Sequence, residues 1–156
     1  MTSRVSLAVA TALGVGYVPF APGTFGSLAG LALYAGVRTT GMPIVETAAI
    51  ILVFVIGAWS ATAAEGHFGH IDPGPVVIDE VLGMLVTLAF VPVSLTGALV
   101  GFFFFRLFDV IKPPPCNTLE ALHGGWGIMS DDAMAAVYAH LCVRGLAWLA
   151  PTWMLA

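Results

Sequence analysis

Charged side chains are scarce in this sequence. They make up 9% of its 156 residues, whereas ordinary soluble domains carry about 25%. The hydrophobic fraction is 59% and the mean hydropathy is +0.98. A water-facing globule of this size would lack the polar side chains needed to cover its surface, so a soluble cytosolic domain is disfavoured. The high apolar content also excludes a disordered chain.

Basic residues and cysteines are few as well. Five Lys and Arg residues and a formal net charge of -4 argue against a nucleic-acid partner. The two cysteines, Cys116 and Cys142, form no CxxC or similar spacing, so neither a disulfide framework nor a zinc site is indicated. The length suits one domain, residues 1–156. These absences leave a small membrane protein as the remaining class.

Long uncharged stretches support a membrane location. No charged residue occurs in 5–37, 47–64, 81–105 or 133–143. A helix needs about 20 mainly apolar residues to cross a hydrocarbon core of roughly 30 Å, and several segments approach or reach that length. We therefore predict an all-α fold, a small multi-pass integral membrane bundle of about five to six helices.

Prolines and glycines set the expected helix boundaries. The start resembles a secretory signal, but the rest of the chain is equally apolar, so we expect a retained short helix over 6–17. The further expected helices are 27–40, 44–64, 78–92, 95–109 and 132–150, with loops at 18–27 and 65–75. One kinked helix over 81–105 is the alternative to a division near Pro92 and Ser94. The loops after 17, 64 and 109 then lie on one side of the membrane. Arg106 and Lys112 favour the cytoplasm for that side, whereas Arg38 favours the opposite orientation.

The few charges are strongly clustered. Ten of the fourteen fall between residues 65 and 132. Five acidic residues stand at predicted helix ends on one side: Asp79, Glu80, Asp109, Asp131 and Asp132. Such a set is typical of a Mg²⁺ site, because Mg²⁺ prefers carboxylate oxygens and substrate phosphates. Helix N-terminal acids, stabilised by the macrodipole or acting as caps, remain the alternative for Asp79-Glu80 and Asp131-Asp132.

Two features are candidates for binding an anionic oxygen group. Arg106, Asp109 and Lys112 follow each other at i, i+3 spacing, which predicts one helix face carrying either a local ion-pair triad or two phosphate-binding cations. The segment 23–27 precedes a helix, so backbone N–H groups around Thr24, Gly26 and Ser27 are candidates for phosphate binding. Turn formation and close helix packing explain the same glycines equally well.

Histidines give weaker signals. His67 and His70 lie near Asp72 in a glycine-rich segment, where a transition-metal site is conceivable but lacks a further His or Cys ligand. His123 is either a proton donor to the reaction or a loop residue that forms hydrogen bonds.

Four segments together resemble the phosphatidylglycerophosphatase A family. They are Pro22-Gly23-Thr24-Phe25-Gly26-Ser27, then Asp72-Pro73 through Val77-Ile78-Asp79-Glu80-Val81-Leu82-Gly83-Met84, then Phe105-Arg106-Leu107-Phe108-Asp109-Val110-Ile111-Lys112-Pro113, and His123-Gly124-Gly125-Trp126-Gly127-Ile128-Met129-Ser130-Asp131-Asp132. Each is modest alone, but their order and spacing span nearly the whole chain.

The resemblance implies a Mg²⁺-dependent phosphoric monoester hydrolase that converts phosphatidylglycerophosphate to phosphatidylglycerol and phosphate in phospholipid biosynthesis. It also implies a bundle around one central helix, here the one after Asp79-Glu80. The location that goes with this activity is the bacterial cytoplasmic membrane, with the active site on the cytoplasmic side. The sequence does not determine the oligomeric state.

With this activity in view, we assign roles to the candidates. Asp79, Glu80, Asp109 and Asp132 are the expected catalytic residues, and with Asp131 they hold one or two Mg²⁺ ions. The expected substrate-binding residues are Thr24, Gly26, Ser27, Arg106, Lys112 and His123. Attack by water and an aspartyl-phosphate intermediate both stay open.

Two other functions compete with the phosphatase. A transporter or ion-binding membrane protein would use the same acidic cluster to line a cation path. A structural or assembly subunit would tolerate Asn or Gln at the acidic positions.

Overall fold

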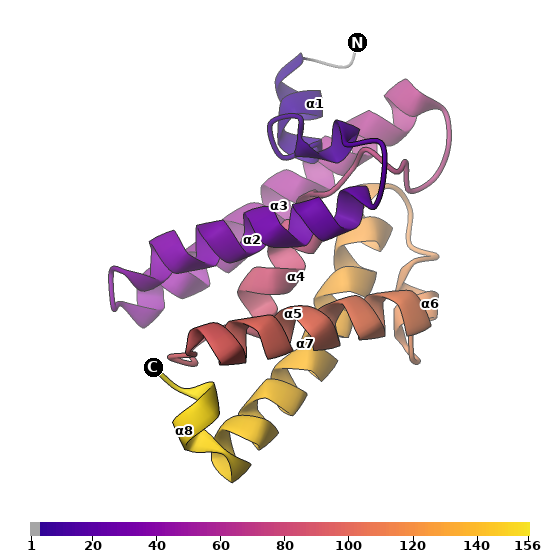
Figure 1. Ribbon diagram of the computed structural model, residues 1–156. Helices are drawn as coiled ribbons and strands as arrows, with labels where there is room; N and C mark the ends of the chain where they lie inside the picture. Colours follow the sequence, from indigo (N-terminus) through magenta and orange to yellow (C-terminus); the bar gives the residue numbers. More distant parts are fainter. Residues whose placement is uncertain (1–3) are drawn as a thin grey trace.

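The computed structural model describes residues 4–156 and, within that range, consists of helices joined by short connections (Figure 1). The prediction of an all-α fold is therefore confirmed. Five helices form the body: α2 (Pro22–Arg38), α3 (Pro43–Phe68), α4 (Ile78–Thr87), α5 (Leu95–Ile111) and α7 (Gly125–Leu149). Four short elements complete it: α1 (Arg4–Ala10), the 3₁₀ helix η1 (Val15–Tyr17), α6 (Cys116–Leu119) and α8 (Pro151–Met154).

Helix α4 is the centre of the bundle. It packs against α2, α3, α5 and α7, which lie around it in Figure 1. Eight of its ten residues are buried, so the helix is covered on nearly every side. This arrangement confirms the expectation of a central helix after Asp79-Glu80. It also fixes the N-terminal turn of α4, with its two acids, inside the protein.

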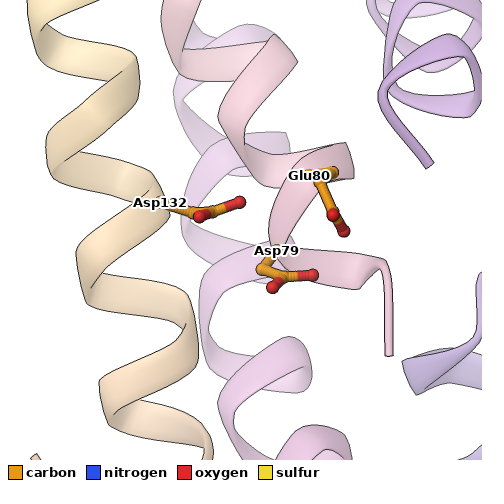
Figure 2. A group of neighbouring side chains, drawn as sticks. All are labelled: Asp79, Glu80 and Asp132. Atoms are coloured by element: carbon orange, nitrogen blue, oxygen red, sulfur yellow. The ribbon is translucent and has the colours of Figure 1, made fainter. Parts of the chain in front are cut away.

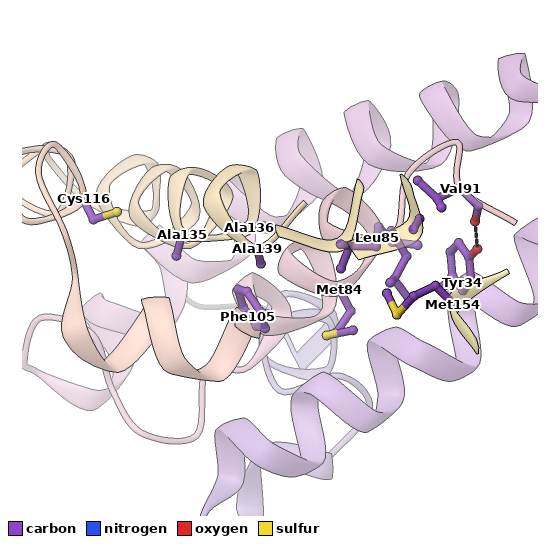
Figure 3. Packing of buried hydrophobic residues seen from close by; sticks show 13 residues of the cluster. Tyr34, Met84, Leu85, Val91, Phe105, Cys116, Ala135, Ala136, Ala139 and Met154 are labelled. Atoms are coloured by element: carbon purple, nitrogen blue, oxygen red, sulfur yellow. Dashed lines mark hydrogen bonds between the residues drawn. The ribbon is translucent and has the colours of Figure 1, made fainter. Parts of the chain in front are cut away.

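Small residues allow the neighbouring helices to approach α4 closely. A Cβ on Gly30 of α2 would lie 2.8 Å from Cβ of Met84, and one on Gly83 would overlap the ring of Phe105 from α5. Phe105 is fully buried, and Figure 3 shows it beside Ala135, Ala136 and Ala139 of α7. Helix α5 therefore lies directly against both α4 and α7.

Two helices begin earlier than the sequence predicts. Helix α2 begins at Pro22, because proline suits the first helical position and Ala21 turns the chain in the left-handed region with φ 46°. Helix α7 begins at Gly125, whose N–H donates to Oγ1 of Thr62 in α3 at 2.8 Å. Asp131 and Asp132 thus lie in the second turn of α7, and their interpretation as N-terminal caps is wrong.

Other predicted boundaries also move. The helix expected over 6–17 is divided, because Ala12, Leu13 and Gly14 all have positive φ and turn the chain between α1 and η1. Helix α3 continues to Phe68 and ends where Gly69 adopts φ 78°. The predicted division between the fourth and fifth helices is confirmed, since residues 88–94 separate α4 from α5.

Helix α3 has the properties of a membrane span. Among residues 4–156 it is the one helix long and apolar enough to cross a bilayer by length and composition, with a mean hydropathy of 2.1 over its best window. Only 28% of that window is buried within the protein. An apolar helix that its own protein leaves largely uncovered is suited to lipid contact.

Candidate active site

A single pocket is lined by charged side chains from three helices, α4, α5 and α7, and from the loop before α4, and by uncharged residues at the start of α2. Its volume is about 250 Å³, and it lies where α2 and α4 begin and α5 ends. The lining residues are Ala21, Pro22, Gly23, Asp72, Gly74, Val76, Asp79, Glu80, Arg106, Asp109, Lys112, Asp131 and Asp132. The structure thus brings together all five predicted acidic residues and both predicted cations.

Three of these carboxylates form a compact group. One oxygen each of Asp79, Glu80 and Asp132 lies within 4.8 Å of the others, and Figure 2 shows the side chains converging from α4 and α7. The side chains of Asp79 and Asp132 are 6% and 4% exposed. Asp79 Oδ1, Glu80 Oε2 and Asp132 Oδ2 are buried without a hydrogen-bond partner. Unpaired buried carboxylates are costly, so the group has the properties of a cation site.

Arg106 forms the wall beside this group. Its Nη1 lies 2.8 Å from Oδ2 of Asp109, one turn further along α5, and 3.4 Å from Oε1 of Glu80. The guanidinium is therefore oriented by two carboxylates and remains one quarter exposed. A planar fork held in this way is suited to bind phosphate oxygens at the edge of a cation site.

Lys112 departs from the predicted face shared with Arg106 and Asp109. It ends α5 with φ 48°, so the chain leaves the helix there. Its Nζ lies 2.7 Å from Oδ2 of Asp131 and 2.9 Å from Oε1 of Glu120. Burial alone would lower the pKa of Lys112, but the hydrogen bonds with Asp131 and Glu120 raise it overall, so the ammonium stays charged. The predicted triad is therefore divided into two separate ion-pair groups.

Helix α2 contributes Gly23 to the pocket wall. A Cβ at this position would overlap Oε1 of Glu80 and would lie 2.9 Å from both terminal nitrogens of Arg106. Gly26 lies one turn further along α2 and faces Val77. A Cβ added at Gly26 would lie 2.7 Å from Cβ of Val77. The glycines of this segment thus serve close packing, the alternative that the sequence left open.

The other predicted substrate-binding residues do not line the pocket. Ser27 is fully buried, and its hydroxyl donates to the carbonyl oxygen of Gly23 at 2.9 Å. The N–H of Thr24 donates to the carbonyl of Ala21. His123 is exposed in the connection between α6 and α7. His67 and His70 are exposed near the end of α3 and belong to no group of three metal-ligating side chains in the described part of the chain.

Two acidic residues at the pocket are missing from the predicted catalytic, metal-binding and substrate-binding residues. Asp72, in the loop before α4, lines the pocket, and Glu120 at the end of α6 pairs with Lys112. Both belong to the charge cluster between residues 65 and 132. That clustering was the available signal for both, and Asp72 also belongs to one of the four segments that resemble the family, whereas Glu120 lies outside them.

Comparison with known proteins assigns the chain to a family. The family model for phosphatidylglycerophosphatase A matches residues 8–147. A phosphatidylglycerophosphatase A of Haemophilus influenzae is 37% identical over 151 residues, covering 94% of this chain and 89% of the relative. The one of Escherichia coli K12 is 34% identical over 132 residues, covering 83% and 76%. A Bacteroides thetaiotaomicron protein, provisionally named a phosphatidylinositol-3-phosphatase, is 33% identical over 154 residues, covering 94% and 96%. No solved structure matches the chain.

Proposed function

The chain belongs to the phosphatidylglycerophosphatase A family, and we propose that it hydrolyses the terminal phosphate monoester of phosphatidylglycerophosphate, releasing phosphatidylglycerol and inorganic phosphate. Family membership supports the reaction, and the charged pocket is the proposed active site. The observation that carries the proposal is the group of three carboxylates, each with a buried oxygen that has no hydrogen-bond partner. Gathering the acids in one pocket supports a hydrolase over a transport path.

The charge balance of the pocket supports a divalent cation as cofactor. Six carboxylates and two cationic side chains line it, so an anionic phosphate would be repelled without a further positive charge. We assign Mg²⁺ to Asp79, Glu80 and Asp132, because these oxygens are unsatisfied and Mg²⁺ prefers carboxylate ligands. When bound, the ion would supply charge neutralisation and polarisation of the phosphoryl group.

The remaining charged residues position the substrate in this proposal. Arg106 binds oxygens of the phosphoryl group, and Asp109 and Glu80 fix its orientation. Asp109 and Asp131 each pair with a cation and, unlike Glu80, have no unsatisfied buried oxygen, so we give them the role of orienting Arg106 and Lys112. Water is the simplest nucleophile for this arrangement, since it needs no covalent intermediate.

We also propose a multi-pass location in the bacterial cytoplasmic membrane, in which α3 is the span that meets both the length and the hydropathy of a membrane helix and α7 is a second span of sufficient length. Large apolar side chains are exposed along α3, α5 and α7, among them Leu52, Leu99 and Leu141. Trp126 and Trp148 are exposed on α7, 22 residues apart, which corresponds to about 33 Å along a helix. That separation matches a hydrocarbon core of roughly 30 Å flanked by interfacial tryptophans. Arg106 and Lys112 favour the cytoplasmic side for the site.

The test measures phosphate release by the purified, detergent-solubilised protein. The substrates are phosphatidylglycerophosphate and, as a comparison, phosphatidylinositol 3-phosphate, each with Mg²⁺ and with EDTA. We expect release from phosphatidylglycerophosphate that EDTA abolishes and added Mg²⁺ restores. Undiminished release in EDTA would overturn the metal requirement, and release from the inositol lipid alone would overturn the substrate.

A further inference from the structure

The pocket holds two cations at two different places. Arg106 touches Glu80, a member of the three-carboxylate group, and therefore lies at the proposed reaction centre. Lys112 touches Asp131 and Glu120, neither of which belongs to that group. Arg106 is placed to bind the phosphate group at the reaction centre. Lys112 is therefore available to bind a second anionic group.

The proposed substrate carries a second anionic group. Besides the terminal monoester, its headgroup contains a phosphodiester that joins it to the diacylglycerol. Resting on the proposed function, we infer that Lys112 binds this phosphodiester and so selects lipids that carry both phosphates. A compact ammonium charge is suited to a singly charged diester, whereas the guanidinium fork suits the terminal group.

The Lys112 side chain is prepared for this role. An ammonium has three N–H donors, and two of them are directed to Asp131 and Glu120. These two carboxylates hold Nζ in place and leave one donor for a ligand in the pocket that Lys112 lines. The side chain is 27% exposed and lines the pocket.

The surface next to Lys112 suits the lipid part of the molecule. Val110 and Ile111, which precede it on α5, are 75% and 61% exposed. A phosphodiester at Lys112 would place the acyl chains beside this apolar surface, while the terminal phosphate points toward Arg106 and the carboxylates. Exposed apolar side chains therefore directly adjoin Lys112, as binding of a diacyl lipid at this residue requires.

Inhibition by the two reaction products tests the two proposed subsites separately. Phosphatidylglycerol retains the phosphodiester, and inorganic phosphate corresponds to the terminal group. We expect Lys112→Gln to raise the inhibition constant for phosphatidylglycerol about tenfold and that for inorganic phosphate less than twofold, with Lys112→Arg restoring much of the loss. Arg106→Lys should show the opposite pattern. A Lys112→Gln variant that weakens phosphate inhibition as much as lipid inhibition overturns the inference.

Two control experiments separate the role of Lys112 in binding from effects on folding and on turnover. Lys112→Gln leaves the buried Asp131 carboxylate without its partner, so the double variant Lys112→Gln/Asp131→Asn is measured as well and should give the same selective loss. Short-chain phosphatidylglycerol is also titrated calorimetrically into each protein, which requires no turnover. If the wild type hydrolyses no phosphatidylglycerophosphate, the proposed function fails while the titration still decides the role of Lys112. The inference about Lys112 is overturned if the wild type and Lys112→Gln bind phosphatidylglycerol equally, or if the wild type does not bind it.

Discussion

Gly23 and Glu80 lie so close together that a Cβ on Gly23 would overlap Oε1 of Glu80. The same Cβ would lie 2.9 Å from Nη1 and Nη2 of Arg106. We therefore expect Gly23→Ala to displace both side chains and to lower kcat by roughly 10- to 100-fold, since small misplacements in an active site have effects of this size. Steady-state kinetics with phosphatidylglycerophosphate measure the change.

Gly36 provides the matched control on the same helix. A Cβ there would meet no atom within 4 Å, so Gly36→Ala should leave kcat unchanged. Alanine is the better helix former, so the free energy of unfolding should rise by up to about 1 kcal/mol. Equal activity in the two variants would show that the contact between Gly23 and Glu80 has no functional role.

Asp132→Asn should affect stability and activity in opposite directions. In the absence of metal it removes one of three close carboxylates, two of them buried, so the melting temperature should rise. In the wild type, a cation at 100 times its Kd adds about 2.7 kcal/mol to the free energy of unfolding; the variant should lose this gain and the phosphatase activity with it. Thermal unfolding with Mg²⁺ and with EDTA measures both effects.

Glu65→Gln is the control for charge removal. Glu65 lies near the end of α3 and does not line the pocket, so its substitution should preserve the stabilisation by Mg²⁺. If Asp132→Asn retained that stabilisation in full, the assignment of the ion to the three-carboxylate group would be wrong.

The sequence predicts the charged part of the site well because charges are so rare in this chain. In an apolar chain, a charged side chain needs a partner, a ligand or water, so acids that recur at predicted helix ends are expected to meet. Asp79, Asp109 and Asp132 come from three helices, and the pocket contains all three. Local residues also indicate the division between α4 and α5, because Pro92 and Ser94 favour two helices over one kinked helix; α4 ends at Thr87 and Ser94 caps α5.

Features that depend on distant contacts could not be predicted. The start of α7 is set by Thr62, which accepts a hydrogen bond from Gly125 across 63 positions of the sequence. Whether Ser27 faces substrate or helix interior depends on how α2 packs, and its hydroxyl is in fact directed to Gly23. Lys112 leaves the helix face because its own backbone turns at the end of α5. Helical periodicity contains none of this information.

Glu46 joins three parts of the fold at the end of the bundle away from the pocket. Its side chain is 4% exposed. Oε1 accepts a hydrogen bond from Nη1 of Arg38 at 2.7 Å, and Oε2 accepts one from the backbone N–H of Phe90 at 2.7 Å. It therefore fastens the C-terminal end of α2 and the segment after α4 to the start of α3.

Glu46→Ala should therefore destabilise the protein without altering its chemistry. The substitution leaves the Phe90 N–H without an acceptor and Arg38 without its ion pair, which should lower the free energy of unfolding by about 1–3 kcal/mol. Glu46→Gln retains an acceptor for Phe90, and because Arg38 is one third exposed the lost ion pair should cost less. In both variants the KM and the Mg²⁺ dependence of the folded enzyme should equal those of the wild type. A change in KM with unchanged thermal stability would mean that Glu46 acts on the site and not on the fold.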